Sequence, residues 1–169
     1  MTILPIATVP DPILKAISTP VDRVDDQLRA FMDDMLETMY AAPGIGLAAI
    51  QVGRPIRLLV MDISEDADTR DPQYYINPVI TWTSSDLATY NEGCLSVPEQ
   101  YADIDRPAEC RLTYLDYHGV EQQVHATGLF ATCIQHEIDH LNGIVFIDYL
   151  SSLKKSMAVR KVRKLVRED

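Results

Sequence analysis

The segment Gln135–Gly143, QHEIDHLNG, constrains the fold more than any other part of this chain. Its two histidines, His136 and His140, are four residues apart, so on a helix they share one face and can bind the same ion. Glu137 would point about a quarter-turn away from His136 and could reach a water on that ion without binding the ion itself.

The surroundings of this motif decide between a metal site and an ordinary helix surface, on which an isolated HExxH also occurs. The neighbouring residues are apolar and predict a buried helix: Leu129, Phe130, Ile134, Ile138 and Leu141. Two imidazoles in a core are poorly satisfied unless they share a ligand. We therefore expect a metal site on a helix that runs from near Thr127 to the C-cap pair Asn142-Gly143.

The third metal ligand cannot be the one that zinc proteases of the HExxH type use, because they take it from a downstream Glu or His. Downstream of His140 the chain has no histidine, and its acids are Asp148, Glu168 and Asp169. The best candidate is upstream, Cys94 in NEGCLSVP, which we expect in a loop. A thiolate with two imidazoles leaves a fourth position open, as catalytic sites require. The alternative for Cys94 is a small buried hydrophobe, the usual fate of a free cysteine.

Three further features carry interpretations of their own. Cys133 shares a helix face with the two histidines, and we interpret it as pocket wall rather than ligand, whereas Cys110 is interpreted as a buried hydrophobe. The segment Gly44–Gln51, GIGLAAIQ, has two glycines two residues apart, which suggests a backbone that something approaches closely. Beside an electrophilic site, the Gln51 amide could donate to a developing oxyanion.

The remaining patterns predict the fold class. Apolar residues at helical spacing over residues 28–40 predict a helix capped by Asp25 and ended by Pro43-Gly44, and residues 152–167 predict a third helix. Strand-like runs are Arg57–Ile63, Tyr74–Trp82, Arg111–Tyr117 and Glu121–His125, the last two joined by a turn at His118-Gly119. The chain is thus predicted to be α+β, with mainly antiparallel sheets packed around the HExxH helix, a long N-terminal helix and a C-terminal helix.

Length and composition bear on domain number and compartment. At 169 residues and 47% hydrophobic, the chain should form a single domain, residues 1–169, with its own core. No apolar run approaches the ~20 residues of a membrane span, and the N-terminus lacks the basic-then-apolar order of a signal peptide. Three cysteines are an odd number, which favours free thiols in a reducing cytoplasm.

Charge is unevenly distributed along the chain. The net charge is −10, and residues 154–169 carry seven Lys/Arg against two acids, a net of +5 that leaves −15 for residues 1–153. The acidic body argues against broad or sequence-specific nucleic-acid binding. The basic tail is compatible with one polyanionic partner contacted locally, or simply with a solvated surface helix.

Taken together, GIGLAAIQ, EGCLS and HEIDHLNG resemble, in that order, the three signature motifs of the peptide deformylases. That family removes the formyl group from the N-terminal formylmethionine of new bacterial proteins. The similarity extends from the PDPIL opening to the tail, and three ordered motifs are far more specific than HExxH alone. The basic helix at residues 152–169 resembles a bacterial subgroup in which this element docks beside the ribosomal exit tunnel.

The resemblance implies roles for specific residues. The metal ligands would be Cys94, His136 and His140, with water on the metal as the nucleophile and Glu137 as general acid and base. The oxyanion donors would be the side chain of Gln51 and the backbone N–H of Leu95. The resemblance also implies substrate-binding residues: Ile45, Gly46 and Gly93 as backbone partners, and Ile45, Leu129 and Cys133 as the methionine pocket.

The resemblance also implies iron(II) as the native metal. A thiolate with imidazoles suits zinc, nickel or cobalt equally well, so these could replace iron in preparations. Tyr101 departs from relatives that carry an arginine near the mouth of the site, which leaves preferences beyond the first methionine open.

Two hypotheses concern other polar residues. Glu92 is expected to orient the Cys94 segment through an ion pair with Arg106, and His118 and His125 are interpreted as surface residues. Two alternatives to a deformylase remain: a metallopeptidase, which the absence of a downstream ligand disfavours, and an inactive deformylase-like module that binds ribosomes or nascent chains. Such a module would have no need of Glu137 or Gln51.

Overall fold

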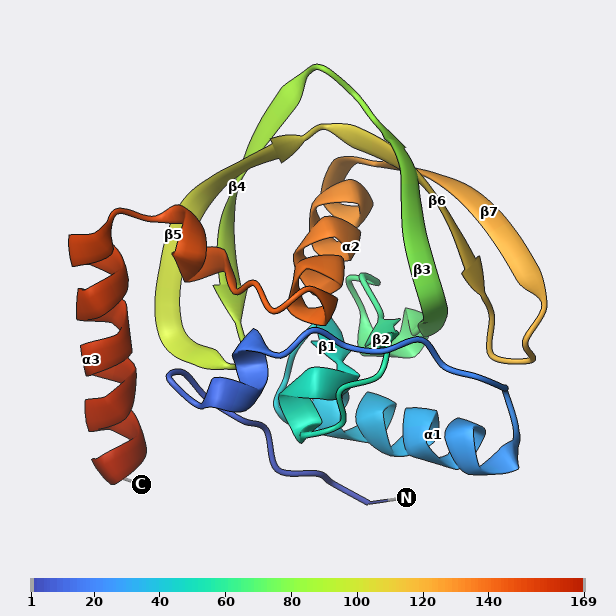
Figure 1. Ribbon diagram of the computed structural model, residues 1–169, viewed down its shortest axis with the longest axis horizontal. Coiled ribbons are helices and arrows are strands. Elements are labelled where there is room, and N and C mark those ends of the chain that lie inside the picture. Colours follow the sequence, from blue (N-terminus) through green and yellow to red (C-terminus); the bar gives the residue numbers. More distant parts are fainter. Residues whose placement is uncertain (1, 169) are drawn as a thin grey trace.

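The protein folds around two antiparallel sheets (Figure 1), as described by a computed structural model for residues 2–168. The larger sheet has the strand order β1-β2-β3-β6-β7, with bounds Gly46–Ala48, Leu58–Met61, Gln73–Thr83, Glu109–Leu115 and Glu121–Thr127. The smaller sheet is a hairpin of β4 (Leu87–Cys94) and β5 (Val97–Pro107). The α+β fold class with mainly antiparallel sheets is therefore confirmed.

The helices lie between and around these sheets. Helix α2 (Gly128–Leu141), which carries HExxH, runs between the β4–β5 hairpin and the larger sheet, whereas α1 (Asp26–Ala41) and α3 (Ser152–Glu168) lie outside them (Figure 1). Residues 2–168 also contain four short 3₁₀ helices: η1 (Pro12–Lys15), η2 (Ala49–Val52), η3 (Ala67–Thr69) and η4 (Phe146–Tyr149). The central position of the HExxH helix matches the prediction. None of the described helices combines the length and apolarity that crossing a membrane requires.

Helix α1 forms as its sequence pattern predicts. The side chain of Asp25 accepts a hydrogen bond from the backbone N–H of Leu28 at 2.9 Å, which satisfies one of the free donors at the helix start. Its apolar stripe is buried in a cluster with residues of β1, β2 and β3: Leu28, Met32, Met35, Met39, Leu47, Leu58, Val60 and Ile76. The methionine-rich face is therefore core.

The sequence patterns did not reveal the β4–β5 hairpin. Cys94 was expected in a loop, but it is the last residue of β4 and pairs with Val97 across a tight turn. The pairing register shifts between Glu92 and Cys94, which marks a bulge. This irregularity re-aims the strand end, so that Cys94 faces α2 rather than continuing the alternation of the strand.

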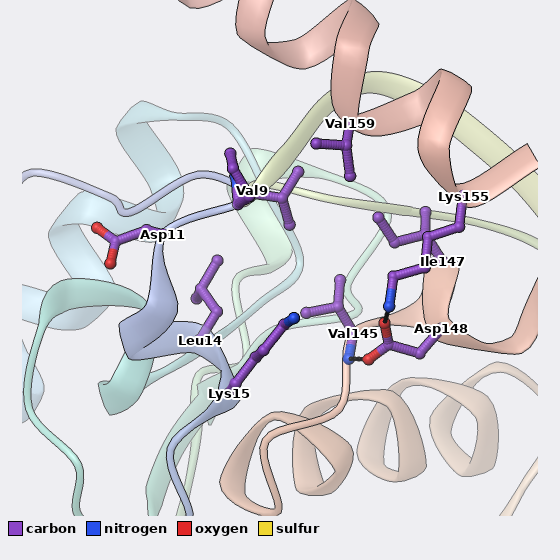
Figure 2. Close-up of a pocket in the computed structure, with 10 residues that line it drawn as sticks. Val9, Asp11, Leu14, Lys15, Val145, Ile147, Asp148, Lys155 and Val159 are labelled. Atoms are coloured by element: carbon purple, nitrogen blue, oxygen red, sulfur yellow. Dashed lines mark hydrogen bonds and ion pairs between the residues drawn. The ribbon is translucent and has the colours of Figure 1, made fainter. Parts of the chain in front are cut away.

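Helix α3 is attached to the body by its apolar face. Ala158 and Val162 are buried in a cluster with residues of β5 and η4, including Val97, Ile104 and Phe146. Figure 2 shows the neighbouring cleft, in which Val159 faces the segment around η1 and Lys155 forms an ion pair with Asp148 at 2.6 Å. The last helix is thus part of the folded core and is not a detached tail.

Candidate active site

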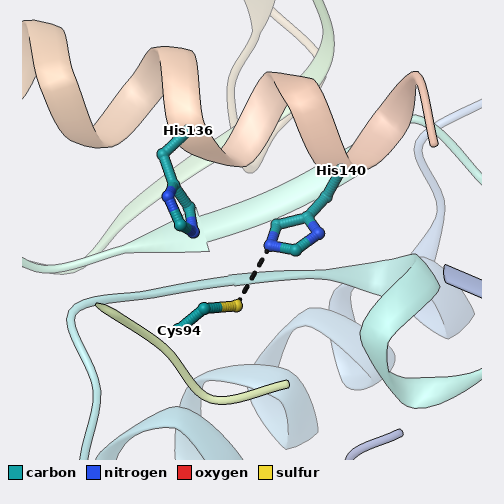
Figure 3. Close-up of side chains that lie close together, drawn as sticks. All are labelled: Cys94, His136 and His140. Carbon is teal, nitrogen blue, oxygen red and sulfur yellow. Dashed lines mark hydrogen bonds between the residues drawn. The ribbon is translucent and has the colours of Figure 1, made fainter. Parts of the chain in front are cut away.

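Three side chains that could bind a metal converge between α2 and the β4–β5 hairpin. His136 and His140 project from consecutive turns of α2 toward Cys94 (Figure 3). The Sγ atom of Cys94 lies 3.3 Å from Nε2 of His140, and one ligand atom from each of the three residues lies within 4.8 Å of the others. The structure therefore brings together the three residues that the sequence predicted as ligands.

This arrangement fits a tetrahedral divalent ion. Zinc bond lengths to sulfur and imidazole nitrogen place those two atoms about 3.6 Å apart at a tetrahedral angle, close to the separation found between Cys94 and His140. The Nδ1 atom of His136 lies 2.8 Å from Oε1 of Glu92, which fixes the proton on Nδ1 and leaves Nε2 to face the thiol. A soft thiolate with two imidazoles suits zinc, iron(II), nickel or cobalt.

The pKa values of the two buried histidines are shifted in opposite directions. Burial, with the positive charges of His136 and Arg106 nearby, lowers the pKa of His140 well below its usual value and keeps its ring neutral. Burial alone would also lower the pKa of His136, but hydrogen bonds to Cys94 and Glu92 raise it to about 10. A metal must therefore displace a proton from His136, so metal binding is coupled to pH.

Glu137 is a buried carboxylate beside this cluster. Its Oε1 atom lies 3.9 Å from Nε2 of His136, and its Oε2 atom has no hydrogen-bond partner among the described residues. Burial raises the pKa of Glu137 to about 7, with His136 and Arg106 opposing part of that shift. An acid group poised near neutrality and free of a permanent partner is suited to proton transfer.

The segment around β1 comes close to Glu137. A Cβ atom on Gly46 would lie 2.7 Å from Oε1 of Glu137, so a larger residue there would displace the carboxylate. Gly93, next to Cys94, also has no space for a side chain, because a Cβ there would lie 2.5 Å from the ring of Tyr101. The close backbone approach inferred from GIGLAAIQ therefore occurs at Gly46.

Gln51 is buried and held by three groups. Its Oε1 atom accepts a hydrogen bond from the N–H of Ala48 at 2.9 Å, which orients the amide so that Nε2 faces Ser96 Oγ at 3.0 Å and Cys94 Sγ at 3.5 Å. The donor of Gln51 is thus directed at the cluster. Leu95, adjacent to Cys94, packs its side chain against Gly44, where a Cβ would lie 2.8 Å away.

The remaining predicted substrate residues differ in their exposure. Ile45 and Leu129 are 47% and 44% exposed, whereas Cys133 is buried. Burial, then the charges of Glu137 and Glu92, raise the pKa of the Cys133 thiol to about 12, so it stays protonated next to the cluster. Cys110 is a fully buried thiol, as interpreted. A methionine pocket formed by Ile45, Leu129 and Cys133 stays a prediction.

The ion pair between Glu92 and Arg106 is confirmed, and it belongs to a larger set of contacts. Arg106 donates from Nε and Nη2 to Glu92 at 2.7 and 2.9 Å, and from Nη1 to Asp139 at 2.8 Å. Sequence reasoning missed Asp139, although its position three residues after His136 was a usable signal. It also missed Ser96 and Tyr149, for which no sequence pattern stood out.

The two other histidines are on the surface, as interpreted. His118 and His125 are exposed, and Nε2 of His125 lies 2.9 Å from Oε1 of the exposed Glu109.

Comparison with known proteins gives one family. The family model described as polypeptide deformylase matches residues 3–156. The chain is 58% identical to the "Peptide deformylase" of Phenylobacterium zucineum (strain HLK1) over 97% of each chain. Among solved structures, that of a peptide deformylase from Ehrlichia chaffeensis has a TM-score of 0.95 at 45% identity and 99% coverage of both chains.

A second solved structure holds a bound compound. The Ehrlichia chaffeensis peptide deformylase in complex with actinonin has a TM-score of 0.93 at 46% identity, covering 97% of this chain and 98% of that one. The same fold and the same family thus extend over nearly all of this sequence, and the chain belongs to the polypeptide deformylase family.

Proposed function

We propose that this protein removes the N-formyl group from the formylmethionine of nascent polypeptides and releases formate. The observation that carries the proposal is the cluster of Cys94, His136 and His140, whose ligand atoms lie within 4.8 Å of one another beside the buried carboxylate of Glu137. The peptide deformylases among its relatives, matched over nearly their full length, support the same reaction.

Cys94, His136 and His140 would hold one divalent ion. When bound, the ion polarises a carbonyl and lowers the pKa of a neighbouring water molecule to about 7 in the case of zinc. The donor set fits several metals, and we propose iron(II) as the native one because the family implies it.

Glu137 would transfer the proton. Its unpartnered Oε2 accepts a proton from the attacking water and returns one to the amine nitrogen as the formyl C–N bond breaks. Water and a formamide thereby give formate and a free amine, with no other reactant. Glu137 is placed for both transfers because it is buried at the cluster but is not one of the three ligands.

Two donors would stabilise the charge that develops on the formyl oxygen. These are the Nε2 group of Gln51, already oriented by Ala48 and Ser96, and the backbone N–H of Leu95. One donor of this kind is typically worth ~3–4 kcal/mol of barrier.

The substrate would bind as an added strand. Its backbone would pair with Ile45, Gly46 and Gly93, and its first side chain would enter a pocket lined by Ile45, Leu129 and Cys133. The exposure of Ile45 and Leu129 is consistent with apolar surface that a methionine covers.

The partner would be the translating ribosome in the cytoplasm. Helix α3 buries Ala158 and Val162 but leaves five basic residues exposed toward the end of the chain: Arg160, Lys161, Arg163, Lys164 and Arg167. This basic surface on an otherwise acidic protein suits polyanionic RNA near the exit tunnel.

One assay tests the reaction. The protein, purified anaerobically with iron(II), should release formate from formyl-Met-Ala-Ser, and a chelator should stop the release. New peptide fragments instead of formate would indicate a metallopeptidase. Neither product, with a metal bound, would indicate a binding module.

A further inference from the structure

A continuous set of hydrogen bonds connects the candidate metal ligand His136 with Tyr149. The Tyr149 hydroxyl donates to Oδ2 of Asp139 at 2.6 Å, and the same oxygen accepts from Nη1 of Arg106 at 2.8 Å. Arg106 makes a two-point contact with Glu92, which in turn accepts from Nδ1 of His136 at 2.8 Å. Four contacts thus separate the phenol of η4 from the imidazole of α2.

The charges in this network are buried except at the Tyr149 end. Arg106 and Glu92 are 5% and 6% exposed, so each charge depends on its partner for stabilisation. The side chain of Asp139 is 18% exposed, and Tyr149 is 53% exposed. The Tyr149 ring also lies 5.3 Å from the guanidinium carbon of Arg106. Tyr149 is therefore the most exposed member of the network and contacts both Asp139 and Arg106.

We propose that Tyr149 is a positioning residue for the metal. Its hydroxyl fixes the carboxylate of Asp139, which holds Arg106 in two-point contact with Glu92, and Glu92 fixes the ring of His136 with Nε2 toward Cys94. Without that hydroxyl, Asp139 turns toward solvent and Arg106 loses one of its two anionic partners. Glu92 then has a less fixed partner, and the orientation of His136 loosens.

Effects of this kind on metal affinity are measurable. Replacing the partner of a metal-binding histidine typically weakens metal binding 10- to 100-fold. Asp139 and Arg106 lie between Tyr149 and Glu92, which is the direct partner of His136. We therefore expect an effect of about tenfold on metal affinity, at the lower end of that range. The inference rests on the proposed metal site but is independent of which reaction the metal serves.

The test compares Tyr149→Phe with Tyr117→Phe. Tyr117 is a matched control because its hydroxyl also contacts an aspartate, Asp33, at 3.2 Å, on α1 and away from the metal ligands. Zinc dissociation constants are measured by competition with a chromophoric chelator, and the melting temperature of each metal-free variant is recorded. Tyr149→Phe should weaken zinc binding about tenfold, and Tyr117→Phe should leave it unchanged.

A double variant tests whether Tyr149 acts through Asp139. Asp139→Asn should weaken zinc binding at least as much as Tyr149→Phe, and combining the two should add nothing. Unchanged affinity in Tyr149→Phe, an equal loss in Tyr117→Phe, or additive losses in the double variant would each overturn the proposal. Zinc binding that follows the expected pattern without formate release would contradict the proposed function and leave this inference standing.

Discussion

Gly46 and Glu137 are in contact in a way that leaves no space for a side chain on the glycine. A Cβ atom at position 46 would lie 2.7 Å from Oε1 of the carboxylate. The glycine on β1 thus sets the position of a side chain on α2, and a backbone element shapes the site without supplying a functional group of its own.

The first prediction concerns this contact. Gly46→Ala should push Glu137 away from its position and reduce the rate of formate release about 100-fold, because a misplaced acid–base group loses part of its 10²- to 10⁴-fold contribution. Bound metal, measured by elemental analysis, should be unchanged. Gly53→Ala serves as control: a Cβ there meets nothing within 4 Å, although φ is +88°, so it should lower stability and spare turnover. Equal losses of activity in both variants would contradict the role of the contact.

The second prediction separates proton transfer from metal binding. Glu137→Gln keeps the shape of the side chain but cannot accept a proton, so formate release should fall by about 10²- to 10⁴-fold. The metal content should match that of the unchanged protein because Glu137 is not one of the three clustered ligands. A variant that loses its metal would show instead that Glu137 is needed for binding.

The third prediction concerns Gln51. Gln51→Met is similar in size and removes the amide donor, so the rate should fall on the order of 100- to 1,000-fold. The N–H of Ala48 and the hydroxyl of Ser96 would lose their partner in a buried site, which should also cost about 1–3 kcal/mol of unfolding free energy. Single-turnover kinetics and urea unfolding measure the two effects separately. Loss of stability with an unchanged rate would exclude Gln51 as an oxyanion donor.

The fourth prediction concerns acid stability. Burial alone would raise the pKa of Asp62, but hydrogen bonds from Ser64, Tyr40 and the backbone of Asp71 lower it below its usual value. A carboxyl group whose pKa is lowered on folding stabilises the folded state above its unfolded pKa, near 3.8, and loses that contribution as pH falls through the folded value. The free energy of unfolding should therefore decrease as the pH is lowered below about 4. The Asp62→Asn variant should have a lower free energy of unfolding at pH 7 and lose less of it as the pH is lowered. If the free energy of unfolding depends on pH identically in both proteins, Asp62 does not contribute to acid stability in this way.

The fifth prediction concerns α3. Deleting residues 152–169 would expose the core around Ala158 and Val162, so it is a poor test of a docking surface. Reversing exposed charges with Arg160→Glu and Lys164→Glu should reduce co-sedimentation with ribosomes, most clearly at low salt, while turnover of a free formylated tripeptide is unchanged. Undiminished co-sedimentation would exclude these basic residues from the contact.

Much of this architecture could be predicted because its signals are local. The apolar stripe of α1 and its Asp25 cap follow from spacing within one helix, and the two histidines share a face because they are four residues apart. The thiol of Cys94 was found by elimination, since nothing downstream of His140 could complete the metal site.

The rest depends on contacts between distant elements. Strand β4 of the hairpin has a mixed polar and apolar sequence, LATYNEGC, with a bulge near its end, so no clean alternation marks it. Arg106 is 33 residues from Asp139 in the sequence and meets it only when the hairpin packs beside α2. The position of Tyr149 follows from the return of the chain after α2 and has no signature in the residues around it.

The separation of Cys94 and His140 by 46 residues has a consequence for how the site is completed. The hairpin is synthesised before α2. An ion that meets the hairpin alone can therefore bind the thiolate but neither imidazole of the HExxH motif. An ion that binds the finished site joins two elements that the chain itself links only through β6 and β7. Metal binding therefore requires that α2 has packed beside the hairpin, and it stabilises that packed arrangement by mass action.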